Sequence, residues 1–238
     1  MTAETVARWD AFLGKLRGRV DETLAQAEEG CAMLLDVNGL DPQPMTIAWM
    51  AIETQLHELT QKVDQTWEAK VEPALEGTPG VEAEREKGDA LRRDIERQKD
   101  ALEVRMFADA ARKIYAQAKA NLARDQKCAQ CGAAMKLGQA FFRSRHLTCS
   151  FCTNVNTFVP GSLISSVEYF CCHHLAREKS APQWAAWLAA EHGPRAQAEA
   201  ALKAYATAYL NARIEIVPEY AADFEKDLKG KMAFFFER

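Results

Sequence analysis

Apolar residues recur at steps of three and four over the first part of the chain, which is the spacing of one helix face. They form a single seam made of Val6, Trp9, Leu13, Leu16, Val20, Leu24, Ala27, Cys31 and Leu34. Asn38-Gly39 then favours a left-handed stop, and Pro42 prevents the helix from continuing. The pattern predicts one long helix over residues 3–37.

Two further amphipathic stretches predict helices over residues 45–75 and 81–125. The apolar stripe of the first is Ile52, Leu56, Leu59, Val63, Trp67, Val71 and Leu75. The stripe of the second is Leu91, Ile95, Leu102, Met106, Ala110, Ile114 and Leu122. Gly88 and the charge run from Glu82 to Asp89 lead us to expect that the first turns of this helix fray or stand in solvent. The short connection at 76–80 makes the two helices antiparallel neighbours, so we expect an elongated three-helix bundle with its hairpin tip there.

Helical spacing returns after Pro160-Gly161. One apolar face carries Ile164, Val167, Cys171, His174 and Leu175. Pro182 suits the start of a short helix, and Gly193-Pro194 ends it. An alanine-rich helix over 195–213 and a last helix after Pro218 complete a C-terminal helical region at 162–238.

Two cysteine pairs, Cys128 with Cys131 and Cys149 with Cys152, carry the clearest chemistry in the chain. Each C-x2-C turn brings two sulfurs to one side of a short loop, and two such turns supply the four ligands of a tetrahedral ion. The spacing predicts one structural Zn²⁺ bound by these four cysteines; two redox pairs or unrelated thiols are the alternative. Four thiolates leave no open position, so we expect no catalytic role for the metal.

The residues around these pairs predict short strands. The stretch 140–148 is aromatic and partly alternating and leads into Cys149, and 154–159 reads as a second strand. The segment therefore contains a C-x2-C turn, which we call a knuckle, then a strand, a second knuckle and a second strand. This is the order of elements in a zinc ribbon. The predicted fold is therefore mainly α, with three parts: a helical bundle with a long antiparallel hairpin at 1–125, an inserted four-cysteine zinc ribbon with a small amount of β at 126–161, and the C-terminal helical region.

The charge of the chain is uneven. Residues 128–160 carry Lys136, Arg143 and Arg145 and no acidic residue, a charge of +3, which leaves −7 for the remainder of a chain whose net charge is −4. Phe141 and Phe142 beside these arginines, together with His146, could stack on bases while the arginines neutralise phosphates. They could equally belong to a strand with one phenylalanine inside. The −7 elsewhere repels a polyanion, so nucleic acid is the less favoured partner.

A second possible metal cluster is Cys171-Cys172-His173-His174. On a helix, Cys171 and His174 lie three residues apart and could face one ion, but further ligands are scattered over other elements. A half-buried helix with cysteines on its apolar face is the alternative. His146 could also substitute as a ligand near Cys149, although four cysteines already suffice.

Location follows from features that the chain does not have. The sequence begins without a basic and apolar leader, and no apolar run approaches the roughly 20 residues of a membrane span. Seven cysteines, four of them expected as metal ligands, fit a reducing compartment better than a disulfide framework. We expect a cytoplasmic protein that does not enter the membrane.

A helical hairpin followed by C-x2-C-G, seventeen intervening residues between the pairs and C-x2-C resembles the DksA/TraR proteins over residues 45–152. The cysteine spacing and Gly132 match as motif. That family inserts its coiled-coil tip into the secondary channel of RNA polymerase, so the resemblance implies a polymerase-associated factor. The family's tip carries paired aspartates, which the tip here lacks, and the family continues as helix where 154–159 here is extended.

The sequence shows no glycine-rich phosphate loop and no catalytic triad. We therefore expect no enzyme, but an adaptor or assembly subunit that works through protein–protein contacts. The alternative is a regulatory factor that binds nucleic acid or RNA polymerase through the basic ribbon or the hairpin tip. The sequence identifies neither the partner nor the oligomeric state.

Overall fold

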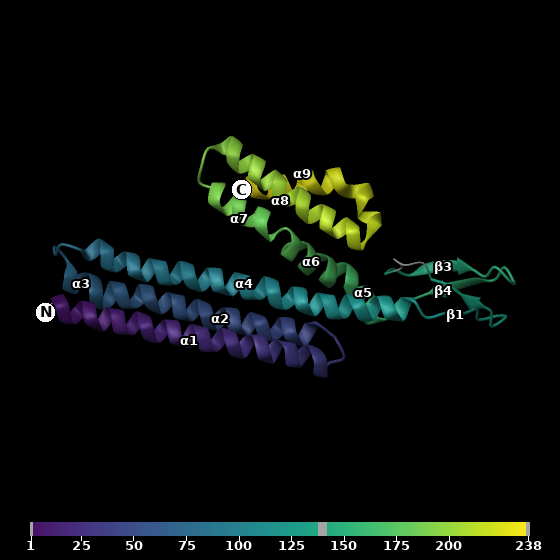
Figure 1. The fold of residues 1–238 in the computed structure, drawn as a ribbon, viewed down its shortest axis with the longest axis horizontal. Helices are drawn as coiled ribbons and strands as arrows, with labels where there is room; N and C mark the ends of the chain where they lie inside the picture. The colour runs from purple at the N-terminus through teal and green to yellow at the C-terminus, as the bar shows by residue number, and fades with distance from the viewer. Residues whose placement is uncertain (1, 138–141, 237–238) are drawn as a thin grey trace. The chain divides into compact units, whose positions relative to one another are not determined.

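The computed structural model describes residues 2–137 and 142–236 and is mainly helical, with two small antiparallel sheets (Figure 1). This confirms the predicted fold class at that level. The chain forms two compact units, residues 1–106 and 107–238. The predicted division at 125 and 161 stays a prediction. None of the described helices combines the length and the apolar composition that crossing a membrane requires.

The first unit contains the three predicted long helices. They are α1 (Thr2–Val37), α2 (Gln43–Thr66) with its extension, and the start of α4 (Val81–Leu122). The extension is a π-helical turn, η1 (Trp67–Val71), followed by the short helix α3 (Glu72–Leu75). Pro73 explains the π turn, because its ring clashes with the carbonyl four residues earlier and its nitrogen cannot donate. The helical turn at this point therefore contains one additional residue, and the helix continues beyond it.

Side-chain contacts define how these helices run. Trp9 Nε1 donates to the Glu84 carbonyl at 3.0 Å, and Glu28 pairs with Arg105 at 2.9 Å, so α1 and α4 run parallel at a nearly constant separation of 75–77 residues. Arg92 of α4 pairs with Asp64 at 3.0 Å, and α2 runs antiparallel to both neighbours. Apolar seams meet between the helices and leave charged side chains outside.

The first turns of α4 do not fray, although most of their charged side chains are exposed to solvent as expected. The helix is regular from Val81, and Gly88 is buried within it. A Cβ atom on Gly88 would lie 2.9 Å from the Trp9 ring and 3.2 Å from Val63 Cγ1. Glycine therefore occurs here because the indole of α1 packs directly on the α4 backbone.

The second unit contains the end of α4, two hairpins and the C-terminal helices. Strand β1 (Gln126–Lys127) pairs with β2 (Ala134–Met135), and β3 (Arg145–Thr148) pairs with β4 (Val155–Phe158). The strand predicted over 140–148 begins only at Arg145; Ala140 and Phe141 lie outside the described residues. The predicted extended segment at 154–159 is confirmed as β4. The β1–β2 hairpin was not predicted.

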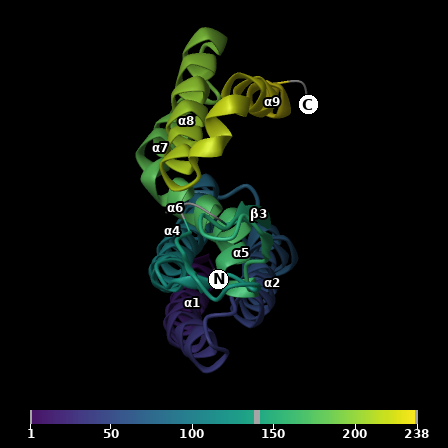
Figure 2. The ribbon, with the colours of Figure 1, turned by 90° about the vertical axis from the view of Figure 1, so that its right-hand side faces the viewer.

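After β4 the chain is helical almost to its end. The elements are α5 (Ser162–Ser166), the π turn η2 (Val167–Cys171), α6 (Cys172–Lys179), α7 (Ala181–Ala190), α8 (Arg195–Ile216), the 3-10 turn η3 (Pro218–Asp223) and α9 (Phe224–Phe236). The last three helices pack together around Leu202, Tyr205 and Tyr209 (Figure 2). Trp184 and Trp187 of α7 pack against this core.

Candidate metal centre

The four predicted ligand cysteines come together in space. The sulfur atoms of Cys128, Cys131, Cys149 and Cys152 all lie within 4.8 Å of one another. Cys128 Sγ is 3.6 Å from Cys152 Sγ, and Cys131 Sγ is 3.7 Å from Cys149 Sγ. A disulfide would need about 2.05 Å, so these are separate thiols around a common centre. They could hold a metal ion.

Two turns of the same design position these sulfurs. In the first turn the Cys128 amide donates to the Ala133 carbonyl, and the Gly132 amide donates to the Cys128 carbonyl, each at 2.9 Å. In the second turn the Cys149 amide donates to the Asn154 carbonyl, and the Thr153 amide donates back to the Cys149 carbonyl, at 2.9 and 3.0 Å.

The residue after each pair takes a left-handed conformation, with φ of +71° at Gly132 and +58° at Thr153. A glycine adopts this conformation without strain, whereas a β-branched residue does so at a cost. The two knuckles are therefore geometrically equivalent, although only the first carries the glycine that sequence reasoning can recognise.

Backbone amides inside each turn point at the first sulfur. The amides of Cys131 and Gln130 lower the pKa of Cys128 to about 6. The amides of Cys152 and Phe151 lower the pKa of Cys149, and the Phe151 nitrogen lies 3.4 Å from that sulfur. These donors favour thiolates, which are the form that binds a metal.

The pKa of the fourth thiol, Cys152, changes in the opposite direction, because the sulfurs are crowded together. At Cys152 the Asn154 amide lowers the pKa, but burial and the three neighbouring sulfurs outweigh it and raise the pKa to about 12. Four negative sulfurs cannot share so small a volume without a compensating charge. A cation at their centre would supply that charge.

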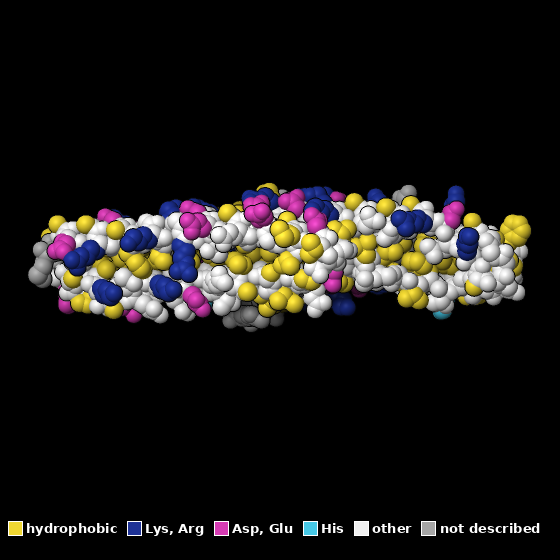
Figure 3. Space-filling model, turned by 90° about the horizontal axis from the view of Figure 1, so that it is seen from below, with side chains coloured by type: hydrophobic (Ala, Val, Ile, Leu, Met, Phe, Trp, Pro, Cys, Tyr) yellow, Lys and Arg dark blue, Asp and Glu magenta, His cyan; other side chains and the backbone are white. Residues whose placement is uncertain are grey.

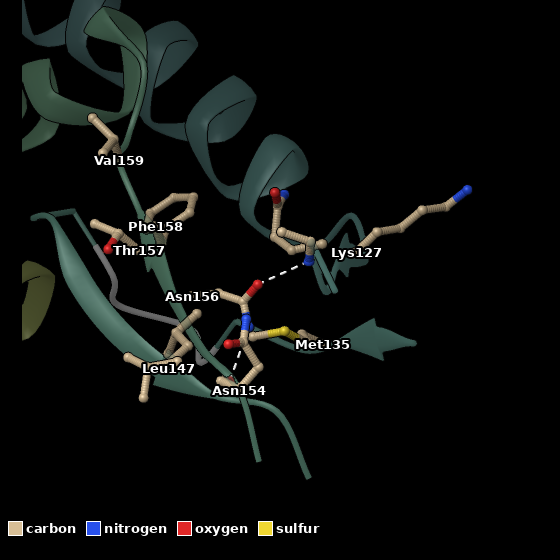
Figure 4. A pocket seen from close by; sticks show the side chains of 11 residues that line it. Lys127, Met135, Leu147, Asn154, Asn156, Thr157, Phe158 and Val159 are labelled. Carbon is tan, nitrogen blue, oxygen red and sulfur yellow. Dashed lines mark hydrogen bonds between the residues drawn. The ribbon is translucent and has the colours of Figure 1, made fainter. Parts of the chain in front are cut away.

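Asn156 connects the two hairpins beside this cluster. Its Oδ1 accepts a hydrogen bond from the Ala129 amide at 2.8 Å, and its Nδ2 donates to the Asn154 carbonyl at 3.1 Å (Figure 4). The same Nδ2 lies 3.5 Å from Cys128 Sγ. Sequence reasoning missed this residue, because its contacts span 27 and 28 residues and no local pattern announces them.

The basic surface predicted beside Cys149 is largely neutralised within the chain. Arg143 Nε donates to Glu168 at 2.7 and 2.8 Å, and its guanidinium lies 5.9 Å from the centre of the Tyr220 ring. Arg145 pairs with Glu219 at 2.6 Å.

The structure does not present Phe141 and Phe142 together as an exposed aromatic pair on that predicted surface. Phe142 is buried, and its ring centre lies 6.3 Å from that of Tyr115 on α4. Phe141 lies outside the described residues. His146 is exposed and its Nδ1 lies 3.1 Å from Thr157 Oγ1, so it stands apart from the sulfur cluster.

The possible second metal cluster is packed into an apolar core instead. Cys171 and Cys172 are fully buried, and burial raises the pKa of each thiol to about 12. His174 stacks on Phe107 and packs against the tilted ring of Phe170, with ring centres 4.6 and 4.5 Å apart, and burial lowers its pKa to about 3. Over residues 2–137 and 142–236, only the four-cysteine cluster brings three or more such ligands together.

Comparison with known proteins gives no guide to function, because no family model, curated protein or solved structure matches this chain. The DksA/TraR resemblance therefore rests on the order of parts and the cysteine spacing alone.

Proposed function

We propose that the chain is a non-enzymatic zinc-ribbon protein that acts as an adaptor or assembly subunit through protein–protein contacts. The observation that carries this proposal is the closed sulfur cluster. Thiolates at about 2.3 Å from a tetrahedral Zn²⁺ lie about 3.8 Å from one another, and two of the sulfur–sulfur distances here are 3.6 and 3.7 Å. Such an ion would hold two short hairpins that cannot bury enough apolar surface alone.

The ligand set argues for a structural ion. Four protein ligands occupy every position of a tetrahedron, so neither water nor substrate can bind the metal. The chain's own residues then do the positioning: the knuckle amides stabilise the thiolates, and Asn156 ties β4 to the first knuckle. The ribbon becomes a rigid platform in the chain between α4 and α5.

The charges favour protein over nucleic acid as the partner. Arg143 and Arg145, which a nucleic-acid surface would need, each face a glutamate. Side chains of both signs appear on the molecular face in Figure 3. A polyanion would have to displace these ion pairs, and it would be repelled by the residues outside 128–160, which carry a charge of −7 in a chain whose net charge is −4.

A factor that binds RNA polymerase or nucleic acid is the second candidate, and one observation favours it. The antiparallel pairing of α2 with α4, for example between Asp64 and Arg92, makes a helical hairpin that turns at residues 76–80. That hairpin, followed by the four-cysteine segment, is the order of parts on which the DksA/TraR resemblance rests.

The two candidates separate in a pair of measurements. Affinity purification of the tagged chain from its native cell, with nuclease treatment, should recover a stoichiometric protein partner. Fluorescence anisotropy with generic single- and double-stranded probes should show no binding at physiological salt. Sub-micromolar, salt-sensitive binding that weakens in the Arg143→Ala, Arg145→Ala variant would overturn the adaptor proposal.

A further inference from the structure

A groove of about 470 Å³ lies between β1 and β4, on the same hairpins that carry the sulfur cluster (Figure 4). Its apolar lining includes Met135, Leu147 and Phe158, which are buried or half-buried. Its polar lining includes Asn156 and Lys127. This volume suits a few side chains of a ligand.

Strand β4 offers an open edge along this groove. Within residues 2–137 and 142–236 it pairs with β3 on one side only, since the sheet has two strands there. The Cys149 amide donates to the Asn154 carbonyl, and antiparallel alternation then turns the backbone groups of Val155, Thr157 and Val159 away from β3. An unpaired strand edge of this kind readily accepts another extended chain.

Exposed apolar side chains accompany that edge. Val155 is 59% exposed and Val159 is 69% exposed, and both line the groove. Valine side chains are normally buried. Here they lie beside the outward-facing N–H and C=O groups of β4, which can form further hydrogen bonds. An extended peptide satisfies both needs at once, with its main chain on the edge and its alternate side chains in the groove.

The charge of the groove specifies the peptide further. No acidic residue occurs between Gln126 and Val167. Lys127 lines the groove and is exposed, and it has no ion pair within the part of the chain that the structure describes. The arginines of the same segment, Arg143 and Arg145, already face glutamates. The Lys127 side chain extends away from the other lining side chains (Figure 4), so it can pair with an acidic residue that lies just outside the groove.

We propose that this groove binds an extended, acidic-apolar segment of a partner protein as an added strand on β4. The partner's apolar side chains contact Met135, Leu147 and Phe158, and an acidic side chain pairs with Lys127. The inference rests on the proposed adaptor function and names the surface and the chemistry of its partner. A peptide fits better than a nucleic acid, because the open edge needs backbone partners and one lysine neutralises few phosphates.

The sulfur cluster and the groove are mechanically linked. Asn156 lines the groove, and its side chain contacts both the Ala129 amide and Cys128 Sγ. The first knuckle therefore holds β1 at its distance from β4. A ribbon that loses its metal should lose the groove as well.

The test uses the full-length, zinc-loaded chain and a phage-displayed library of short random peptides. Enriched peptides should share alternating apolar residues and an Asp or Glu. Thr157→Pro removes an outward N–H of β4 and should weaken their binding by roughly tenfold or more. His146→Pro is the matched control: it changes the cross-strand partner of Thr157, removes the same side-chain contact, and blocks the opposite edge of the sheet. It should leave peptide binding unchanged.

A charge pair of variants tests the same site without touching the strand. Lys127→Glu should weaken the enriched peptides by roughly tenfold, whereas Lys136→Glu, which lies outside the lining, should not. Zinc content of every variant verifies that the ribbon is folded.

The outcomes separate this inference from the function on which it rests. Peptides that bind Thr157→Pro and Lys127→Glu as tightly as the wild type would overturn the groove. So would an RNA oligonucleotide that binds in place of peptides with the same sensitivity to these variants. A protein partner recovered equally by wild type and by both variants would overturn the groove and leave the adaptor proposal intact.

Discussion

Gly88 shows how one residue can be misread when its neighbours in space are unknown. In the sequence it weakens a helix, because glycine costs roughly 1 kcal/mol relative to alanine in a helix interior. In the structure it is buried beneath Trp9, which itself is 1% exposed. The intrinsic preference is overruled by a contact that lies 79 residues away in the chain.

Replacing Gly88 by alanine should therefore destabilise the protein despite the gain in helix propensity. The new Cβ would lie 2.9 Å from a buried indole, and we expect a net loss of about 1–2 kcal/mol. Gly18→Ala, on the exposed side of α1 with open space around it, should instead stabilise by up to about 1 kcal/mol. Urea unfolding of both variants measures the difference; equal effects of the two would contradict the packing of Trp9 on α4.

His174 has a second residue-scale consequence, in the pH dependence of stability. Burial lowers its pKa from the usual 6.5 to about 3, the charges of His173 and Arg177 adding to the effect, and its Nδ1 is buried without a hydrogen-bond partner among the described residues. A histidine with a lowered pKa is neutral in the fold, so the unfolded chain takes up its proton first as pH falls. Stability is therefore lost below about pH 6.5, and the loss continues towards the folded pKa.

His174→Phe should remove this part of the acid sensitivity while keeping the ring contacts with Phe107 and Phe170. Between about pH 7 and pH 5, the free energy of unfolding of the wild type should fall by about 1–2 kcal/mol more than that of the variant. His192→Phe is the control, since the His192 side chain is 94% exposed. Urea unfolding at the two pH values gives the comparison, and parallel losses in wild type and His174→Phe would refute the buried neutral imidazole.

Elements follow from the sequence where their signals are local. The bounds predicted for the three long helices, 3–37, 45–75 and 81–125, lie within a few residues of the observed ones, because apolar seams and the breakers at 38–42 and 77–80 act on neighbouring residues. The clustering of the four cysteines could be predicted for the same reason, since the two sulfurs of each pair are placed by a single turn.

What escaped prediction depends on contacts between distant segments. The ion pairs of Arg143 and Arg145 with Glu168 and Glu219 span 25 and 74 residues. The β1–β2 hairpin is only two residues long on each side, too short for an alternating pattern to appear. Asn156 and Thr153 carry no recognisable motif, although both shape the knuckles.

At the scale of elements, the ribbon should depend on the cluster while the long helices do not. Cys149→Ser removes one of four ligands, so the hairpins over 126–160 should open. Helices α1 and α2 have their own apolar seams and should remain. Hydrogen exchange should rise within about 126–160 only. Cys31→Ser, at a buried cysteine of the first unit, should leave exchange in that segment unchanged; a rise through all the helices in Cys149→Ser would contradict a separable ribbon.

At the scale of the whole molecule, the proposed function depends on what fills the space between the four sulfurs. The knuckle amides, the sulfur separations and the closed ligand set are all accounted for by a single cation that no substrate can reach. The adaptor proposal and the groove both require hairpins held rigid by that ion. Without it, β1 and β4 have little apolar surface to keep them together.

Elemental analysis combined with native mass spectrometry of the purified full-length chain tests this claim most directly. We predict one Zn²⁺ per chain, lost in Cys149→Ser and retained in Cys31→Ser, with Cys128, Cys131, Cys149 and Cys152 as free thiols after the metal is removed. Less than about half an equivalent of zinc, or a disulfide among these four cysteines, would contradict the account.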